Sequence, residues 1–211
     1  MDEAAFDELF GVVEAPLRRT LVAWYDPTVG RDAAQHALEW AWAHRRRLDR
    51  IDNPAGYLFR VGQSHAKREL RRSQVPATWL LPAAVIDGDS PFEPELTGAL
   101  STLSEQQRAA VLLVHGYGYS FREAADVLNV SLSTLRTHAD RGLARLRSHL
   151  EVHESQQLDE RIRNHAAALD QAAPPIRLDG VHASSPSVSG PRLLRPLAAA
   201  AAVVLVVVGG L

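Results

Sequence analysis

Residues 103–150 read LSEQQRAAVLLVHGYGYSFREAADVLNVSLSTLRTHADRGLARLRSHL, and this stretch decides the fold of the chain. It predicts a helix, a second helix, a tight turn and a third helix. A hydroxyl side chain marks each start, because a serine at the N-cap accepts a hydrogen bond from a backbone N–H that has no partner inside the helix. The three starts, each with the residue three positions on, are Ser104 with Gln107, Ser120 with Glu123, and Ser131 with Thr134. In the first two pairs, the glutamine or glutamate completes a reciprocal capping box.

The turn between the second and third helices is very short. The second helix is expected to end at Leu128, and the next residue is Asn129, a type that tolerates the left-handed backbone found at many helix ends. Ser131 then begins the third helix almost at once. So short a connection makes two helices cross sharply, which is the geometry of a helix-turn-helix.

The third helix has an apolar face and a polar face. The apolar residues recur every three or four positions, at Leu132, Leu135, Ala139, Leu143, Leu146 and Leu150. The candidate DNA-reading residues lie away from this stripe and are Ser133, Thr134, Arg136, Thr137, Arg141 and Arg145. Arginine and small hydroxyl side chains reach guanine edges and phosphates in a major groove. A solvated face on an ordinary three-helix bundle is the alternative, but the short turn and the basic face together favour DNA binding.

This stretch resembles the C-terminal promoter-binding domain of bacterial RNA polymerase sigma factors, specifically those of the extracytoplasmic-function (ECF) group. The matching residues are Leu103, Ser104, Arg108, Ser120, Glu123, Ala124, Ala125, Leu128, Val130, Ser133, Thr134, Leu135, Arg141 and residues 143–147. The resemblance implies that the module reads the minus-35 promoter element. His138 departs from the arginine usual in the family. A Thr-His pair at this point also occurs in LuxR-type two-component regulators, so a stand-alone transcription regulator remains an alternative.

Charge is unevenly spread along the 211 residues, whose formal net charge is −2. Residues 1–43 carry eight acidic and three basic residues, whereas residues 44–72 carry three acidic and nine basic residues. Residues 73–103 hold four acidic residues and no basic one, and residues 104–150 hold six basic and four acidic residues. Two basic blocks separated by an acidic connector indicate two contacts with a polyanion.

The N-terminal third of the chain predicts three helices, so the whole chain is expected to be all-α. Apolar spacing predicts a first helix that ends at Trp24, with Pro16 as a kink or break, and a second helix over residues 31–48. Trp40 and Trp42 lie two positions apart and therefore point to different sides of the second helix. One is expected to pack inside, and the other is either an anchor for a partner protein or also partly buried.

The third N-terminal helix, expected over residues 55–72, combines aromatic and basic side chains. Rings that stack on bases and cations that meet phosphates are what single-stranded DNA binding uses. Phe59 belongs to this stretch, and its candidate DNA-binding residues are Tyr57, Arg60, Lys67 and Arg71. Taken by itself, the stretch is more typical of core aromatics beside a solvated face.

Residues 6–72 resemble the N-terminal domain of ECF sigma factors, although less closely than residues 103–150 resemble the C-terminal one. The resemblance implies that the second helix grips core RNA polymerase, and that the third helix helps to open and read the minus-10 element. The residues implied in core binding are Asp32, Gln35, Glu39 and Trp42. The departures from the family pattern are His36, Gln63, Ser64 and Arg68, and they leave the promoter preference open.

Composition divides the chain into five parts. Residues 1–72 and 103–150 are the two helical domains, joined by a flexible linker over residues 73–102 that is rich in proline and acidic residues. Residues 151–191 form an extension, helical at first and then a tether, and residues 192–211 form a hydrophobic tail expected to be helical. Its apolar run, residues 197–211, spans about 22 Å as a helix, against about 30 Å of bilayer core. The run is therefore a short anchor, a membrane span cut off early, or a helix packed on the protein.

The sequence shows no catalytic constellation. It has no cysteine, no glycine-rich phosphate loop, and no third ligand near any pair of its nine histidines. No enzymatic activity, metal or cofactor is therefore expected. The prediction is an ECF sigma factor with an atypical C-terminal extension that binds core RNA polymerase, promoter DNA and an anti-sigma factor in the cytoplasm, with residues 197–211 as a candidate tether to the inner face of the cell membrane. The alternatives are a LuxR-type regulator and a membrane-anchored scaffold without DNA function.

Overall fold

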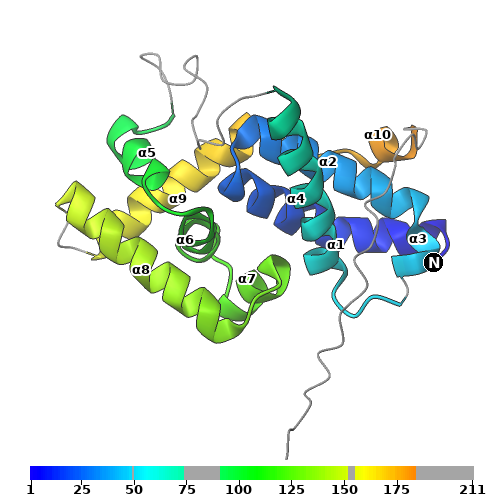
Figure 1. The fold of residues 1–211 in the computed structure, drawn as a ribbon, viewed down its shortest axis with the longest axis horizontal. Helices are drawn as coiled ribbons and strands as arrows, with labels where there is room; N and C mark the ends of the chain where they lie inside the picture. Colours follow the sequence, from blue (N-terminus) through cyan, green and yellow to red (C-terminus); the bar gives the residue numbers. More distant parts are fainter. Residues whose placement is uncertain (49, 74–90, 152–154, 184–211) are drawn as a thin grey trace, which may run out of the picture.

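The structure is a computed structural model that describes residues 1–48, 50–73, 91–151 and 155–183 (Figure 1). Regular secondary structure in these residues is all helical, which confirms the all-α prediction. Helices α1, α2 and α4 pack into one bundle, α5 to α8 form a second, and α9 lies against both (Figure 1). The predicted hydrophobic tail falls outside the described residues. Within them, no helix is long and apolar enough to cross a membrane.

The N-terminal bundle comprises α1 (Glu3–Trp24), α2 (Pro27–Ala43), the short α3 (Arg45–Leu48) and α4 (Pro54–Ser73). Side-chain caps start the long helices. Asp2 accepts a hydrogen bond from the backbone N–H of Ala5 at 2.9 Å, and Asp26 accepts one from that of Val29 at 2.8 Å. Proline is the first residue of α2 and of α4, where its missing N–H costs nothing and its fixed φ suits a helix.

Two details of this bundle differ from the sequence expectation. Helix α1 runs through Pro16 without a break, and Thr20 donates a hydrogen bond to the Pro16 carbonyl at 2.7 Å. Helix α2 begins at Pro27 and not at residue 31, because Asp26 is an N-cap followed by a proline in the first helical position. Phe59 is fully buried and packs edge-on against Trp24, with ring centroids 5.3 Å apart, so it belongs to the core.

The C-terminal bundle comprises α5 (Pro94–Ser101), α6 (Glu105–Val111), the π-helical turn η2 (Leu112–Gly116), α7 (Phe121–Leu128) and α8 (Leu132–Leu150). Both predicted capping boxes are confirmed, at Ser104 and at Ser120. Asn129 has φ 53° and ψ 50°, the left-handed conformation expected at the end of α7. Helix α5 lies in the stretch whose composition predicted a linker, and it packs against α8.

The extension after α8 contains α9 (Ser155–Ala172) and α10 (Leu178–Ala183). One side of α9 is buried, and its residues are Leu158, Ile162, His165, Ala166 and Leu169. This helix packs on η2 and reaches α2, while α10 packs on α2 (Figure 1). The extension therefore touches both bundles.

Candidate nucleic-acid interface

Helix α8 presents the six predicted DNA-reading residues to solvent. All of them are exposed, namely Ser133, Thr134, Arg136, Thr137, Arg141 and Arg145. The start of the helix is fixed by Ser131, whose hydroxyl accepts a hydrogen bond from the Thr134 backbone N–H at 3.1 Å. The same Ser131 Oγ lies 3.0 Å from the Ser133 hydroxyl and 2.7 Å from the Thr134 hydroxyl. The first turn of α8 is thus a cluster of exposed hydroxyl groups at a helix N-terminus, which carries positive partial charge.

The apolar side of α8 is held close to α6. Leu135, Ala139 and Leu146 are fully buried. Gly142 allows the two helices to approach closely, because a Cβ built at this position would lie only 2.6 Å from Cγ2 of Val111. A rigid inner side therefore fixes the direction in which the outer residues point.

The arginines of α8 differ in their local contacts. The Arg136 guanidinium lies 5.8 Å from the ring centroid of Phe121 on α7, a cation–π contact that steadies it next to the turn. Arg145 lies nine residues further on, about 14 Å along the axis, and donates a hydrogen bond to the Thr102 carbonyl at 3.4 Å. Arg136 therefore lies beside the turn, and Arg145 lies further along the same exposed helix near the end of α5.

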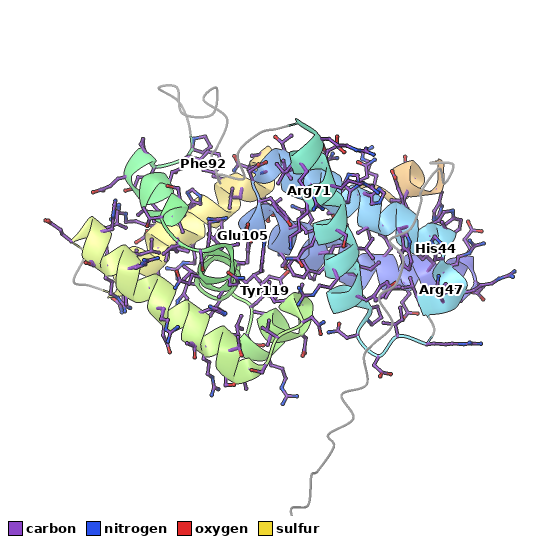
Figure 2. All side chains as sticks on the ribbon, viewed as in Figure 1. His44, Arg47, Arg71, Phe92, Glu105 and Tyr119 are labelled. Carbon is purple, nitrogen blue, oxygen red and sulfur yellow. The ribbon has the colours of Figure 1, made fainter. Side chains whose placement is uncertain are left out.

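The N-terminal bundle has a basic aromatic cavity that sequence reasoning did not single out. It has a volume of about 520 Å³ and is lined by Trp40, Arg46, Arg47, Arg50, Ile51 and Tyr57. Trp40 stacks on His44, with centroids 4.3 Å apart, and its centroid is 5.3 Å from that of Tyr57. Figure 2 shows His44 and Arg47 together at the α3 end of the molecule. The signal in the sequence was the run of three arginines directly after the Trp40 helix.

The predicted DNA-binding residues of α4 are spread along the helix. Tyr57 is half-buried in the wall of the cavity, whereas Arg60, Lys67 and Arg71 are exposed. Arg60 donates a hydrogen bond to Gln63 at 3.0 Å, and Arg71 donates one to the Lys67 carbonyl at 3.1 Å. Tyr57 and Arg71 are about 21 Å apart along the axis, so the four residues do not form one compact cluster.

The predicted polymerase-binding residues lie on α2. Asp32 is exposed, and Gln35 donates a hydrogen bond to Glu39 at 3.1 Å. Trp40 is buried, with 3% exposure, whereas Trp42 is partly exposed. Arg45 covers the Trp42 ring at 4.3 Å, and His182 of α10 stacks on it at 4.1 Å. The two tryptophans therefore divide as the spacing predicts.

Two histidine environments have lowered pKa values. Burial, with the neighbouring charge of His65, lowers the pKa of His36 to about 4, and the two rings stack 3.9 Å apart. Burial also lowers the pKa of His165 to about 4. The imidazole rings of His36 and His165 are therefore neutral at pH 7. The described part of the chain holds no cluster of three His, Cys, Asp or Glu side chains that could bind a metal ion.

Comparison with known proteins agrees with this geometry. Residues 94–146 match the family model described as sigma-70, region 4, which spans α5 to α8. ECF RNA polymerase sigma factor SigK of Mycolicibacterium vanbaalenii is 29% identical over 136 residues, 62% of this chain and 61% of that protein. SigK of Mycobacterium tuberculosis is 28% identical over 175 residues, 72% of this chain and 88% of that protein. SigX of Bacillus subtilis is 36% identical over 69 residues, 33% of this chain and 36% of that protein.

A solved structure shares the fold. It is the sigma factor RpoE in complex with the anti-sigma factor NepR from Bartonella quintana, with a TM-score of 0.50 and 23% identity, covering 71% of this chain and 99% of the other. Over α5 to α8 the chain thus matches sigma-70 region 4, and over most of its length it is similar to ECF RNA polymerase sigma factors.

Proposed function

We propose that this protein binds core RNA polymerase and directs it to promoters by recognising a minus-35 and a minus-10 element. The single observation that carries the proposal is the exposed polar face of α8, presented by a capped helix-turn-helix within a match to sigma-70 region 4. The match to SigK across both bundles supports the polymerase-dependent function over a stand-alone regulator, whose N-terminal part would be unrelated.

Recognition of the minus-35 element is assigned to the first three turns of α8. Arg136 and Arg141 carry the planar donors that pair with guanine O6 and N7 in the major groove. The hydroxyls of Ser133, Thr134 and Thr137 are short and suit phosphate or base contacts close to the helix. Arg145 extends the contact to a further phosphate.

Recognition of the minus-10 element is assigned to α3, α4 and the cavity between them. The walls offer the half-buried Tyr57, backed by the buried Trp40, as an apolar surface for a base, and three exposed arginines for the phosphates on either side. A base captured in such a site is removed from the duplex, so binding itself favours strand opening. Lys67 and Arg71 continue the positive charge along α4.

The remaining assignments follow from this one. Asp32, Gln35, Glu39 and Trp42 of α2 contact core polymerase. The protein supplies position and binding free energy, and the polymerase performs the chemistry, so no catalytic residue is assigned. An anti-sigma factor is the expected regulatory partner, as the RpoE complex has one. The site of action is the cytoplasm, where polymerase and promoters meet.

Run-off transcription tests the proposal. The full chain, bacterial core polymerase and genomic promoter fragments are mixed, and transcript 5′ ends are mapped. Discrete start sites that require both protein and core are expected. Arg163→Ala serves as the matched control for variants of α8, because Arg163 is an exposed arginine on α9. DNA binding that is specific without core, together with no core-dependent transcript, would instead identify a stand-alone regulator.

A further inference from the structure

We propose that α9 and α10, residues 155–183, form an intramolecular clasp that closes the two bundles on each other and covers the α2 face intended for core polymerase. Polymerase binding then requires displacement of the clasp. The inference rests on the proposed function, since it names how that α2 surface is regulated. Three sets of contacts support it. The extension contacts α1 and α2 of the first bundle, it contacts the second bundle, and the two bundles contact each other.

The first set fastens the clasp to α1 through buried charge. Arg18 is 3% exposed and donates hydrogen bonds to Asp170 at 2.9 Å and to the Ala173 carbonyl at 2.8 Å. Arg19 donates two more to Asp170 Oδ2, at 3.0 and 2.7 Å, and these raise the pKa of its guanidinium. Glu14, also buried, pairs with Arg18 and accepts a hydrogen bond from the Ile176 backbone N–H at 2.9 Å.

Buried charges of this kind require partners, because desolvation of an unpaired ion costs several kcal/mol. The α1 side chains Arg18 and Glu14 find partners in residues 170–176. The side of α1 that carries Glu14 and Arg18 is therefore an interface with the extension and not a solvated helix face.

The clasp then runs over α2. Arg31 donates a hydrogen bond to the Pro174 carbonyl at 3.1 Å, and Gln35 lines a cavity together with Pro174 and Ile176. His182 stacks on Trp42 at 4.1 Å. Two of the four residues assigned to polymerase binding, Gln35 and Trp42, thus lie beside or beneath the extension.

The same extension holds the second bundle. Arg161 of α9 donates hydrogen bonds to Glu93, at 3.0 Å from Nε, and to Glu95, also at 3.0 Å. His115 of η2 pairs with Asp159 at 3.2 Å. A Cβ at Gly116 would lie 2.8 Å from the Ala166 Cβ, so η2 and α9 are in close backbone contact.

With the clasp in place, the two DNA-reading units touch. Asn53, just before α4, donates a hydrogen bond to the Asp126 carbonyl of α7 at 2.7 Å. Arg108 of α6 donates to the Ala23 and Trp24 carbonyls at the end of α1, at 3.0 and 2.6 Å. The two promoter elements are about 25 base pairs apart, which is about 85 Å at 3.4 Å per base pair. This closed arrangement cannot place both units on DNA at once, so a working sigma factor must open it.

The test compares single substitutions in the full-length chain. Asp170→Asn removes the charge that both α1 arginines share, and Asp179→Asn makes the same change at an exposed position of α10. Affinity for core polymerase is measured by fluorescence titration. Because apparent affinity scales with the fraction of the chain that is open, Asp170→Asn is expected to bind core about tenfold more tightly than the wild type. Asp179→Asn should match the wild type.

A second variant guards against a folding defect at Asp170. His182→Glu places a carboxylate next to Asp7, whose carboxylate lies 3.7 Å from the His182 ring nitrogen, and should loosen α10 from Trp42 without touching the buried charges. It too should bind core more tightly. Equal affinity of wild type, Asp170→Asn and His182→Glu would overturn the clasp.

A distance measurement separates this inference from the proposed function. Spin labels on Glu69→Cys in α4 and Arg122→Cys in α7 use exposed positions of a chain that has no cysteine. One narrow distance distribution is expected in the wild type, and longer, broader distances with core or in Asp170→Asn. Failure of every variant to bind core or support transcription would overturn the proposed function. Normal transcription with distances unchanged by Asp170→Asn would overturn the clasp alone.

Discussion

Two groups of arginines in this protein are used in opposite ways. Arg136 and Arg141 of α8 are exposed, and among the described residues neither forms an ion pair. Arg18 of α1 is buried and Arg19 beside it half-buried, and both pair with Asp170. The first group keeps its charge available for an external polyanion, and the second uses it to fasten the chain to itself. Residue type alone therefore does not separate binding from structure; burial and partners do.

The largest expected effect concerns the buried group. Arg18→Ala leaves the Glu14 carboxylate buried beside Ile176 without its cation. Loss of one partner of a buried pair lowers the free energy of unfolding by about 3–5 kcal/mol. Urea denaturation measures it, with Arg163→Ala as the control, expected to lie within about 0.5 kcal/mol of the wild type. A small effect of Arg18→Ala would mean that α1 does not depend on the extension.

A buried histidine extends the comparison to pH. Burial lowers the pKa of His165 to about 4, so below the unfolded value of about 6.5 the unfolded chain takes up a proton that the folded chain excludes. Its contribution to stability is therefore lost as pH falls from 6.5 towards 4, by about 3 kcal/mol. His165→Leu removes this dependence. The unfolding free energies of the wild type and of His165→Leu are measured from pH 7 to pH 4, and the wild type should lose stability relative to the variant as the pH falls. Parallel curves for the two proteins would contradict the burial argument.

The exposed group is expected to affect binding and not stability. Arg136→Ala should weaken specific promoter binding by about 1–3 kcal/mol if it pairs with a guanine, and leave the unfolding transition unchanged. Fluorescence anisotropy with a core-bound complex measures the first quantity. If Arg136→Ala lost as much stability as Arg18→Ala, the distinction between arginines that bind DNA and arginines that stabilise the fold would be wrong.

The smallest effect separates base contacts from phosphate contacts on α8. Arg145→Ala removes a candidate phosphate contact, so affinity should fall about equally for all DNA sequences. The slope of log affinity against log salt should become shallower by about 0.9. Arg136→Ala should instead change the ranking of sequences. If Arg145→Ala changed the ranking of DNA sequences, Arg145 would contact a base and not a phosphate.

Local chemistry made the C-terminal module predictable. Ser104, Ser120 and Asn129 act on neighbouring backbone groups, so the helix boundaries and the turn follow from a few adjacent residues. The exposed side of α8 follows from the three-to-four spacing of its leucines. The start of α2 was missed because an Asp-Pro pair serves equally as a turn and as a helix start.

Packing between distant segments was not predictable in the same way. The apolar residues of α9 from Leu158 to Leu169 recur at helical spacing, but such a stripe does not say which part of the chain will cover it. Burial of Phe59 depends on Trp24, 35 positions away. The ion pair between Arg18 and Asp170 joins residues 152 positions apart, and neither residue stands out in sequence from an ordinary solvated charge.

The most direct test of the central claim is a promoter-base exchange measured by run-off transcription. Wild type and Arg136→Ala are each assayed with core polymerase on templates that carry each of the four bases at successive minus-35 positions. We expect the wild type to favour guanine at one position, and Arg136→Ala to lose that preference while keeping the others. Identical base preferences in the two proteins would contradict the assignment of Arg136, near the start of α8, as a reader of the minus-35 element.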